Sequence, residues 1–318
     1  MPTIRNLVFQ GGGVKGSAYA GAIGVLAQGG ALADVRRVAG TSAGAITATM
    51  LAIGAGPEGL MRSVRETDFG SFLDIGWNLL ADANRLLHHF GVAPGAHFAE
   101  LLGDEVARYT GDRGTTLGQL RAKAEAHPGH FHDLYIVTSN LTRQRSQVLC
   151  ADNHPEMPVW LAVRASMSMP FIFEPVRVGD DVFVDGGLSW NYPVDLFDHP
   201  EVYLAGPRGG HPRTEETLGF SLEPKALFEA GVRDWSSLPG HTESLLAYTT
   251  SLMGFLSETA NAEHLHAADL PRTIFIDDLG VRATDFKAPK AVIERLIASG
   301  ADAARAWLAR RSLVGVGE

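Results

Sequence analysis

One serine of this chain stands in a context typical of a catalytic nucleophile. Gly40-Thr41-Ser42-Ala43-Gly44 has the pattern GxSxG and lies between an apolar run, residues 35–39, and an alanine-rich segment, residues 43–53. Between a strand and a helix this pattern forms a sharp turn that exposes the serine hydroxyl, and the helix N-terminus behind it favours developing negative charge. Ser42 is therefore the candidate nucleophile. A solvated serine in a glycine-rich turn is the alternative.

A second glycine-rich stretch, FQGGGVKGSAYAG, occupies residues 9–21. Three of its glycines fit the GxGxxG spacing of a dinucleotide site, but no acidic residue ends the second expected strand, about twenty positions on, to bind a ribose. The Walker A motif is excluded because Lys15 is followed by Gly16 and not by serine or threonine. The sequence therefore argues against a phosphate site here.

The same glycines are expected to supply an oxyanion hole. They follow the first expected strand, and Ser42 follows the second. Because neighbouring parallel strands end at one edge of a sheet, backbone N–H groups around Gly12, Gly13 and Val14 are expected to point toward the Ser42 hydroxyl. There they would stabilise the oxyanion of a tetrahedral intermediate.

A serine nucleophile needs a base, and Asp185 is the best placed carboxylate. It ends the run VFVD, and the two glycines after it allow close approach of another backbone or a ligand. An Asp-Gly turn between two strands is the alternative. An α/β-hydrolase fits poorly, because that fold places several strands before its nucleophile and only about forty residues precede Ser42.

Three motifs occur in a characteristic order, GGGVKG at residues 11–16, GTSAG at 40–44 and DGG at 185–187. In this order they resemble the patatin-like phospholipases, as does the block ASMSMPFIFEPV upstream of VDGGLSWNYPV. The resemblance spans residues 4–196 and, more loosely, 284–286. It implies an α/β fold of three layers, in which a mainly parallel central sheet is flanked by helices and carries a helical insertion or cap.

The resemblance also implies the roles of the site residues. Ser42 and Asp185 would form a dyad without a third member, and a partly desolvated Asp185 with a raised pKa would be the better base. The oxyanion hole would comprise the N–H groups named above, with Ala43 as a further donor. No cofactor and no metal or calcium ion is implied.

Two residues depart from the family's usual pattern. Many members have aspartate before the three glycines and arginine after the variable residue, where this chain has Gln10 and Lys15. Lys15 keeps the positive charge but lacks the planar fork with which arginine makes paired hydrogen bonds. Neither residue changes a backbone donor, so we expect the site to remain functional.

The order of apolar segments independently predicts the fold class α/β. Strands expected at 4–9 and 35–39 are each followed by a helix, at 18–26 and 43–53, and two such units favour a parallel sheet. Residues 57–130 show helical patterns, turns near 91–95 and 111–114 and no clear strand, and are expected to form the cap. Further expected elements are strands at 134–140, 147–150, 182–184, 202–205 and 273–276, an amphipathic segment at 243–256, and helices at 159–168 and 289–310.

Composition narrows the functional classes. The 318 residues are 45% hydrophobic, as in a globular protein, and we expect a catalytic domain at 1–210 that helices and a strand of 211–318 complete. The net charge of −9 argues against nucleic acid as a partner. The single Cys150 excludes a disulfide framework and suits a reducing compartment. His127, His130 and His132 fit either a metal site or a proline-glycine loop.

We expect a cytoplasmic protein, because the N-terminus lacks the features of a signal peptide and no uncharged apolar run is long enough to span a bilayer. Export by a dedicated secretion system stays open. The expected substrate is a phospholipid or lysophospholipid, met in transient contact with a membrane or micelle. The aromatic stretch at 69–80 would line an acyl channel or touch the membrane, although core packing is the commoner role.

Three points stay open on the sequence alone. The same dyad could transfer the acyl group to an acceptor other than water. The chain could instead be a catalytically silent lipid-binding protein. The third point is whether an activating protein partner is needed.

Overall fold

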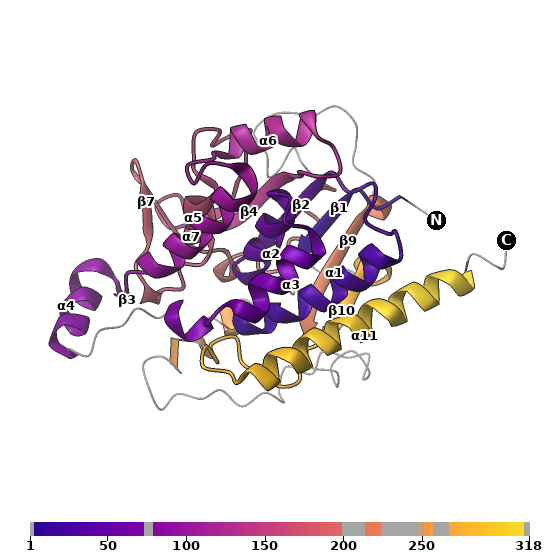
Figure 1. Ribbon diagram of the computed structural model, residues 1–318. Helices are drawn as coiled ribbons and strands as arrows, with labels where there is room; N and C mark the ends of the chain where they lie inside the picture. Colours follow the sequence, from indigo (N-terminus) through magenta and orange to yellow (C-terminus); the bar gives the residue numbers. More distant parts are fainter. Residues whose placement is uncertain are drawn as a thin grey trace.

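The protein is built on one central sheet. The computed structural model describes residues 3–72, 79–198, 214–223, 248–249, 251–252, 254–256 and 267–314 (Figure 1). Within these residues the parallel strands are β1 (Asn6–Phe9), β2 (Arg37–Thr41), β4 (Asp133–Asn140), β9 (Thr217–Glu223) and β10 (Thr273–Asp277). Their order across the sheet is β10-β9-β1-β2-β4, so the first two strands of the chain lie side by side at its centre.

Antiparallel strands extend the sheet beyond β4. β8 (Asp181–Asp185) pairs with β4, and β7 (Val176–Val178) pairs with β8. β5 (Arg145–Leu149) also pairs with β4 in the antiparallel sense. A separate parallel pair joins β3 (Gly91–Ala93) to β6 (Phe171–Phe173). The register of β8 sets Asp185 opposite Thr138, near the carboxyl end of β4.

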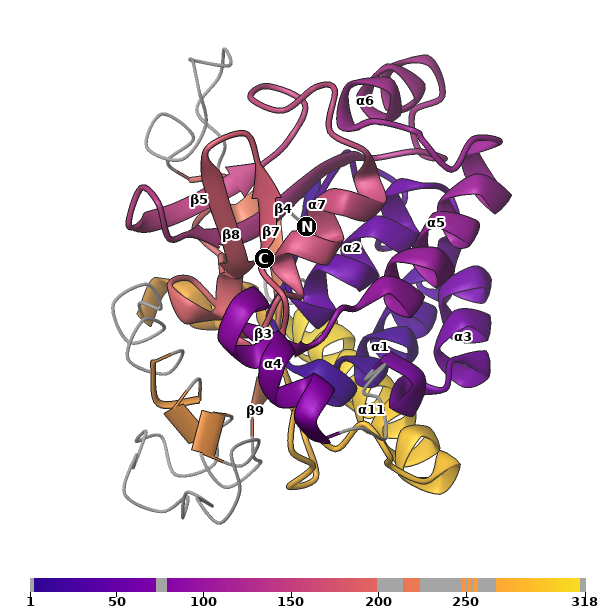
Figure 2. The same ribbon diagram turned by 90° about the vertical axis from the view of Figure 1, so that its left-hand side faces the viewer.

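Most of the long helices gather on one side of the sheet (Figure 2). They are α1 (Ala18–Gln28), α2 (Ala43–Ala52), α3 (Gly56–Glu66), α5 (Ala96–Thr110), α6 (Leu117–Ala126), α7 (Val159–Ser166) and α11 (Lys290–Val314), while α4 (Leu79–His89) lies at the periphery beside β3 (Figure 1). α1 and α11 pack closely because Gly21 has no side chain; a Cβ there would lie 1.8 Å from the Ile297 carbonyl oxygen. No helix of the described segments is both long and apolar enough to cross a bilayer.

Alternate residues of the central strands belong to different cores. Leu7 and Phe9 of β1 belong to the large core on the helical side, whereas Val8 belongs to a second core on the opposite face. The second core is completed by buried side chains of the segment 190–197, which follows β8. The segment that begins at Asp185 therefore covers the sheet face away from the helices.

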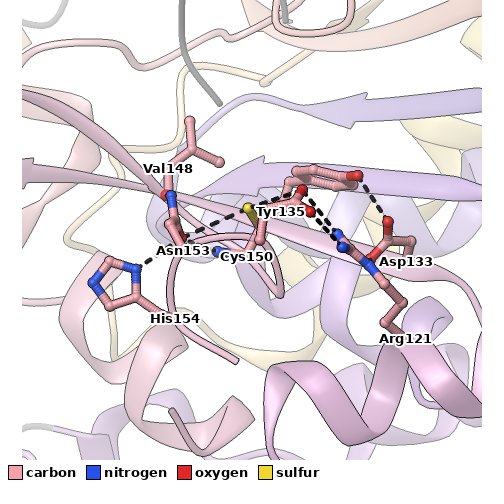
Figure 3. Close-up of polar contacts among 8 residues, drawn as sticks. Arg121, Asp133, Tyr135, Val148, Cys150, Asn153 and His154 are labelled. Carbon is pink, nitrogen blue, oxygen red and sulfur yellow. Dashed lines mark hydrogen bonds and ion pairs between the residues drawn. The ribbon is translucent and has the colours of Figure 1, made fainter. Parts of the chain in front are cut away.

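A mostly buried ion-pair network ties α6 to the sheet (Figure 3). Arg121 of α6 donates to Asp133 at the start of β4 (2.9 Å) and to Asp152 in the turn after β5 (2.7 Å), and the Tyr135 hydroxyl donates to Asp133 (2.7 Å). Backbone hydrogen bonds between residues 115–118 and 155–159 continue the contact up to the start of α7. This network therefore helps to position α7, whose last residue reaches the candidate active site.

Most expected elements are present, with their ends shifted by a few residues. The strands expected at 4–9, 35–39, 134–140, 147–150, 182–184 and 273–276 correspond to β1, β2, β4, β5, β8 and β10, and the helices expected at 18–26, 43–53, 159–168 and 289–310 correspond to α1, α2, α7 and α11. The expected strand at 202–205, residues 73–78 of the aromatic stretch and much of the segment 243–256 lie outside the described residues.

Some strands are not predicted from the sequence. The prediction that the segment 57–130 contains no strand is wrong. β3 lies where a turn near 91–95 is expected, and this three-residue strand is defined by its pairing with β6. β9 is missed because its sequence, TLGFSLE, contains a glycine, which is rare in strands. A Cβ on Gly219 would lie 1.9 Å from the Tyr192 hydroxyl, so packing from another part of the chain requires glycine here.

Candidate active site

Ser42 occupies a strained turn between β2 and α2. Its backbone angles are φ 53° and ψ −122°, in a region that residues other than glycine rarely adopt. The neighbouring glycines permit the turn, because a Cβ on Gly44 would lie 2.3 Å from the Phe9 carbonyl oxygen and one on Gly40 would lie 2.3 Å from the Gly44 carbonyl carbon. The GxSxG segment thus forms the expected turn, with the serine at the N-cap of α2. The expected exposure of the serine is wrong, because Ser42 is buried, with 7% of its surface exposed.

A buried serine holds this turn in place. The N–H of Ser42 donates to Ser166 Oγ (2.8 Å), and the Ser166 hydroxyl donates to the Val137 carbonyl oxygen (2.6 Å). Ser166 is the last residue of α7 and is fully buried. Sequence reasoning missed this residue, and its only signal was a small hydroxyl side chain in the block ASMSMP.

Asp185 reaches Ser42 from the end of β8. The Ser42 hydroxyl donates to Asp185 Oδ2 (2.8 Å), and the N–H of Gly187 donates to Asp185 Oδ1 (2.8 Å). The backbone N–H of Asp185 donates to the Ser168 carbonyl oxygen (2.9 Å), and a Cβ on Gly186 would lie 2.3 Å from the Val137 carbonyl oxygen. The two candidate catalytic residues, 143 positions apart, are thus in direct contact.

Burial changes the acid strength of this carboxyl group. Desolvation raises the pKa of Asp185 to about 6, although hydrogen bonds from Gly187 N–H and the Ser42 hydroxyl favour the charged form and act in the opposite direction. At neutral pH the carboxylate is mostly ionised and is a stronger base than an exposed aspartate. The raised pKa expected for a useful base is therefore present.

The glycine loop lies beside Ser42, with two of its amides unoccupied. A Cβ on Gly11 would lie 3.2 Å from the Ser42 Cβ. Among the hydrogen bonds of the described residues, the N–H groups of Gly12, Gly13 and Ala43 have no acceptor, whereas the N–H of Val14 donates to the Ala283 carbonyl oxygen (3.1 Å).

The N–H of Val14 is therefore not free to bind an oxyanion, although the sequence predicts this role for it. Its N–H already has an acceptor, supplied by a segment 269 residues later in the chain. A pattern of neighbouring residues could not reveal this contact.

The two residues that depart from the family pattern both hold the glycine loop. Gln10 Oε1 accepts hydrogen bonds from the N–H of Leu222 (2.7 Å) and the hydroxyl of Ser221 (2.9 Å), both in β9. Lys15 Nζ forms an ion pair with Asp278 Oδ2 (3.0 Å), just after β10. Gln10 and Lys15 thus connect the loop to strands on the far side of β1 from Ser42.

The cysteine and the histidines near residue 130 are less suited to catalysis than Ser42 and Asp185. Burial raises the pKa of the Cys150 thiol to about 12, so the thiol stays protonated and a poor nucleophile, and burial lowers the pKa of His132 to about 4. The ring of His130 packs edge-on against Phe131. In the segments that the structure describes, no group of three histidine, cysteine or acidic side chains is arranged to hold a metal ion.

The sequence matches the family whose motifs form the candidate site. The family profile described as "Patatin-like phospholipase" matches residues 7–198. An uncharacterised protein of Acanthamoeba polyphaga mimivirus is 32% identical over 196 residues, which cover 61% of this chain and 62% of that protein. The uncharacterised protein YqhO of Bacillus subtilis (strain 168) is 30% identical over 293 residues, or 88% of this chain and 89% of its own length. The chain thus spans less than two thirds of the mimivirus protein and most of YqhO.

Solved structures with the same fold have more distant sequences. VipD from Legionella pneumophila is similar with a TM-score of 0.60 and 18% identity, over 97% of this chain and 67% of VipD. ExoU from Pseudomonas aeruginosa, in its complex with SpcU, is similar with a TM-score of 0.57 and 22% identity, over 98% of this chain and 52% of that one.

These similarities confirm the expected fold class, a layered α/β fold of the patatin type. The chain belongs to the patatin-like phospholipase family, a family of lipid acyl hydrolases.

Proposed function

We propose that this protein is a serine acyl hydrolase that cleaves carboxylic ester bonds of phospholipids or lysophospholipids through an acyl enzyme on Ser42. The observation that carries the proposal is the 2.8 Å hydrogen bond from the Ser42 hydroxyl to Asp185. The acceptor is a buried carboxylate with a raised pKa, and the donor lies on a strained turn at a helix N-terminus. These are the features that an activated serine nucleophile needs.

In the first half of the reaction, Asp185 accepts the hydroxyl proton as Ser42 Oγ attacks the ester carbonyl carbon. The carbonyl oxygen becomes an oxyanion, which the unoccupied N–H groups of Gly12, Gly13 and Ala43 stabilise. The intermediate then collapses, the bond to the leaving alcohol breaks, and protonated Asp185 returns the proton to the alcohol oxygen.

In the second half, a water molecule attacks the acyl enzyme and Asp185 takes a proton from it. The second tetrahedral intermediate then collapses to release the fatty acid, and Asp185 returns its proton to Ser42 Oγ, which restores the hydroxyl and the carboxylate. No step requires a histidine or a metal ion. The N–H of Gly187, which donates to the other carboxylate oxygen, keeps Asp185 aimed at Ser42 throughout.

Family membership supports a lipid as the source of the ester. A lipid substrate implies transient contact with a membrane or micelle surface, because its acyl chains are not free in water. One curated relative, 25% identical over 63 residues, is described as a "Probable lipid hydrolase" of Invertebrate iridescent virus 6. We extend that activity class to this chain as part of the proposal.

The proposal is tested by measuring hydrolysis by the purified protein of phosphatidylcholine in mixed micelles and of a short-chain p-nitrophenyl ester, each with and without a calcium chelator. Ser42→Ala and Asp185→Asn should each lose more than about 99% of the activity, and chelation should have no effect. Ser63→Ala, which alters a partly exposed serine of α3, is the matched control.

A fluorophosphonate probe should label wild type at Ser42, as located by peptide mass spectrometry. Full activity in Ser42→Ala or Asp185→Asn would overturn the proposed dyad.

A further inference from the structure

The glycine loop is held by a segment that lies outside the family match. Asp278 and Ala283 follow β10, whereas the family profile ends at residue 198. Lys15 Nζ lies 3.0 Å from Asp278 Oδ2, and the Lys15 and Asp278 side chains are only 19% and 6% exposed. The N–H of Val14 donates to the Ala283 carbonyl oxygen at 3.1 Å. We call these two contacts the C-terminal clamp.

The clamp leaves little space between its two sides. A Cβ on Gly13, whose φ is +55°, would lie 1.9 Å from the Ala283 carbonyl oxygen. The loop backbone therefore packs directly on the Ala283 peptide, and the left-handed conformation of Gly13 orients the peptide groups on both sides of it. These peptide groups include the Gly13 N–H, which has no acceptor among the hydrogen bonds of the described residues.

The C-terminal side of the clamp is itself fixed. Asp278 Oδ1 accepts the N–H of Gly280 (3.0 Å), and the N–H of Asp278 donates to the Glu223 carbonyl oxygen at the end of β9 (3.2 Å). Further on, Phe286 is buried against Val14 and α11. The segment can therefore transmit a fixed position to the glycine loop.

We propose that Lys15 and Asp278 are positioning residues for the oxyanion hole, so that the catalytic machinery is complete only with the chain that follows β10. The inference rests on the proposed function. Loss of the ion pair leaves a nearly buried carboxylate without its cation and releases one side of the loop, so the Gly12 and Gly13 amides lose their alignment. Misplacement of an oxyanion donor lowers kcat and leaves substrate binding nearly unchanged.

A lysine near an active site could alternatively bind the phosphate of a phospholipid, and the two roles differ in their kinetics. A phosphate-binding Lys15 would affect KM for phospholipids and would not affect turnover of an uncharged ester. A positioning Lys15 affects kcat for both substrates. The comparison therefore uses an uncharged p-nitrophenyl ester beside phosphatidylcholine micelles.

The test measures kcat and KM for Lys15→Met, Asp278→Asn and the double variant. Asparagine at 278 can still accept the N–H of Gly280, so it removes mainly the charge. We expect each variant to lower kcat about tenfold to a hundredfold on both substrates with KM changed less than about twofold. The double variant should be no slower than the slower single variant, because both residues act through one contact. Lys15→Arg should recover most of the rate.

A second readout does not depend on turnover. Hydrogen–deuterium exchange of the peptide covering residues 11–17 should be faster in Lys15→Met and Asp278→Asn than in wild type. The control pair is Arg305→Met and Asp302→Asn, which break an exposed ion pair on α11 and should change neither kcat nor this exchange.

Wild-type kcat on the uncharged ester in folded Asp278→Asn, or unchanged exchange of the loop, would overturn the clamp. So would a loss confined to KM for phosphatidylcholine. Failure of the proposed function has another signature, namely full activity in Ser42→Ala, and the exchange measurement still decides whether the ion pair holds the loop.

Discussion

Replacing Asp185 with asparagine is expected to stabilise the fold at neutral pH while it abolishes activity. The asparagine amide has the shape of the carboxylate, and it can accept the Gly187 N–H and donate to Ser42 Oγ, so both hydrogen bonds of Asp185 can be kept. The substitution therefore removes mainly a buried charge. Burial raises the pKa of this carboxyl from 3.8 to about 6, which corresponds to a destabilisation of roughly 3 kcal/mol when the group is ionised.

The sign of this effect depends on pH. Below about pH 4 the carboxyl is protonated in both the folded and the unfolded chain, and it contributes no difference in stability. Between about pH 4 and pH 6 the unfolded chain ionises first, so the free energy of unfolding falls as pH rises. Above this range the full destabilisation remains. The stabilising effect of Asp185→Asn should thus be largest at neutral and alkaline pH.

Urea unfolding of wild type and Asp185→Asn at pH 4.5 and pH 8 measures the difference. At pH 8 the variant should be more stable by about 2–3 kcal/mol, and at pH 4.5 by only about 1 kcal/mol. Asp180→Asn is the control, because Asp180 is exposed in the turn between β7 and β8, and it should change stability by less than about 0.5 kcal/mol. Equal stability of wild type and Asp185→Asn at pH 8 would refute the reasoning.

Other expected outcomes concern activity and packing. In a pH–rate profile, kcat/KM should rise about tenfold per pH unit up to about pH 6 and then level off, since Asp185 must be ionised, and a flat acid limb would contradict this. Ser166→Ala removes the acceptor of the Ser42 N–H and should lower kcat at least about tenfold and stability by roughly 1–3 kcal/mol, by kinetics and urea unfolding; an unchanged kcat would exclude the positioning role. Arg121→Met removes the guanidinium that pairs with two mostly buried carboxylates, Asp133 and Asp152, and should cost about 3 kcal/mol or more in the same unfolding assay, and a loss below about 1 kcal/mol would contradict it.

The candidate dyad could be located from the sequence because each residue lies in a short, self-contained segment. The turn at Ser42 depends on Gly40 and Gly44 two positions away on either side, and the approach of Asp185 depends on Gly186 and Gly187 directly after it. Local spacing therefore carries the information. The βα units at the start of the chain were predictable for the same reason, since apolar periodicity and turn residues are local signals.

Contacts between distant segments could not be predicted in this way. Ser166, which holds the Ser42 amide, depends on the position of α7, and the ion pairs of Arg121 help to set that position from α6. β9 carries a glycine that close packing against Tyr192 and Val194 explains. A pattern of neighbouring residues contains no trace of such partners, because they are set by the order of strands in the sheet.

The sequence by itself determined the candidate nucleophile, the candidate base and the class of fold, because these follow from backbone geometry that a few adjacent residues impose. Only the tertiary structure decided how strongly the base is perturbed and which amides remain unoccupied. The pKa of Asp185 follows from burial by residues throughout the chain, and the amide of Val14 is occupied because Ala283 packs onto the glycine loop. Desolvation and long-range packing depend on every layer of the fold at once, so they exist only when the whole fold has formed.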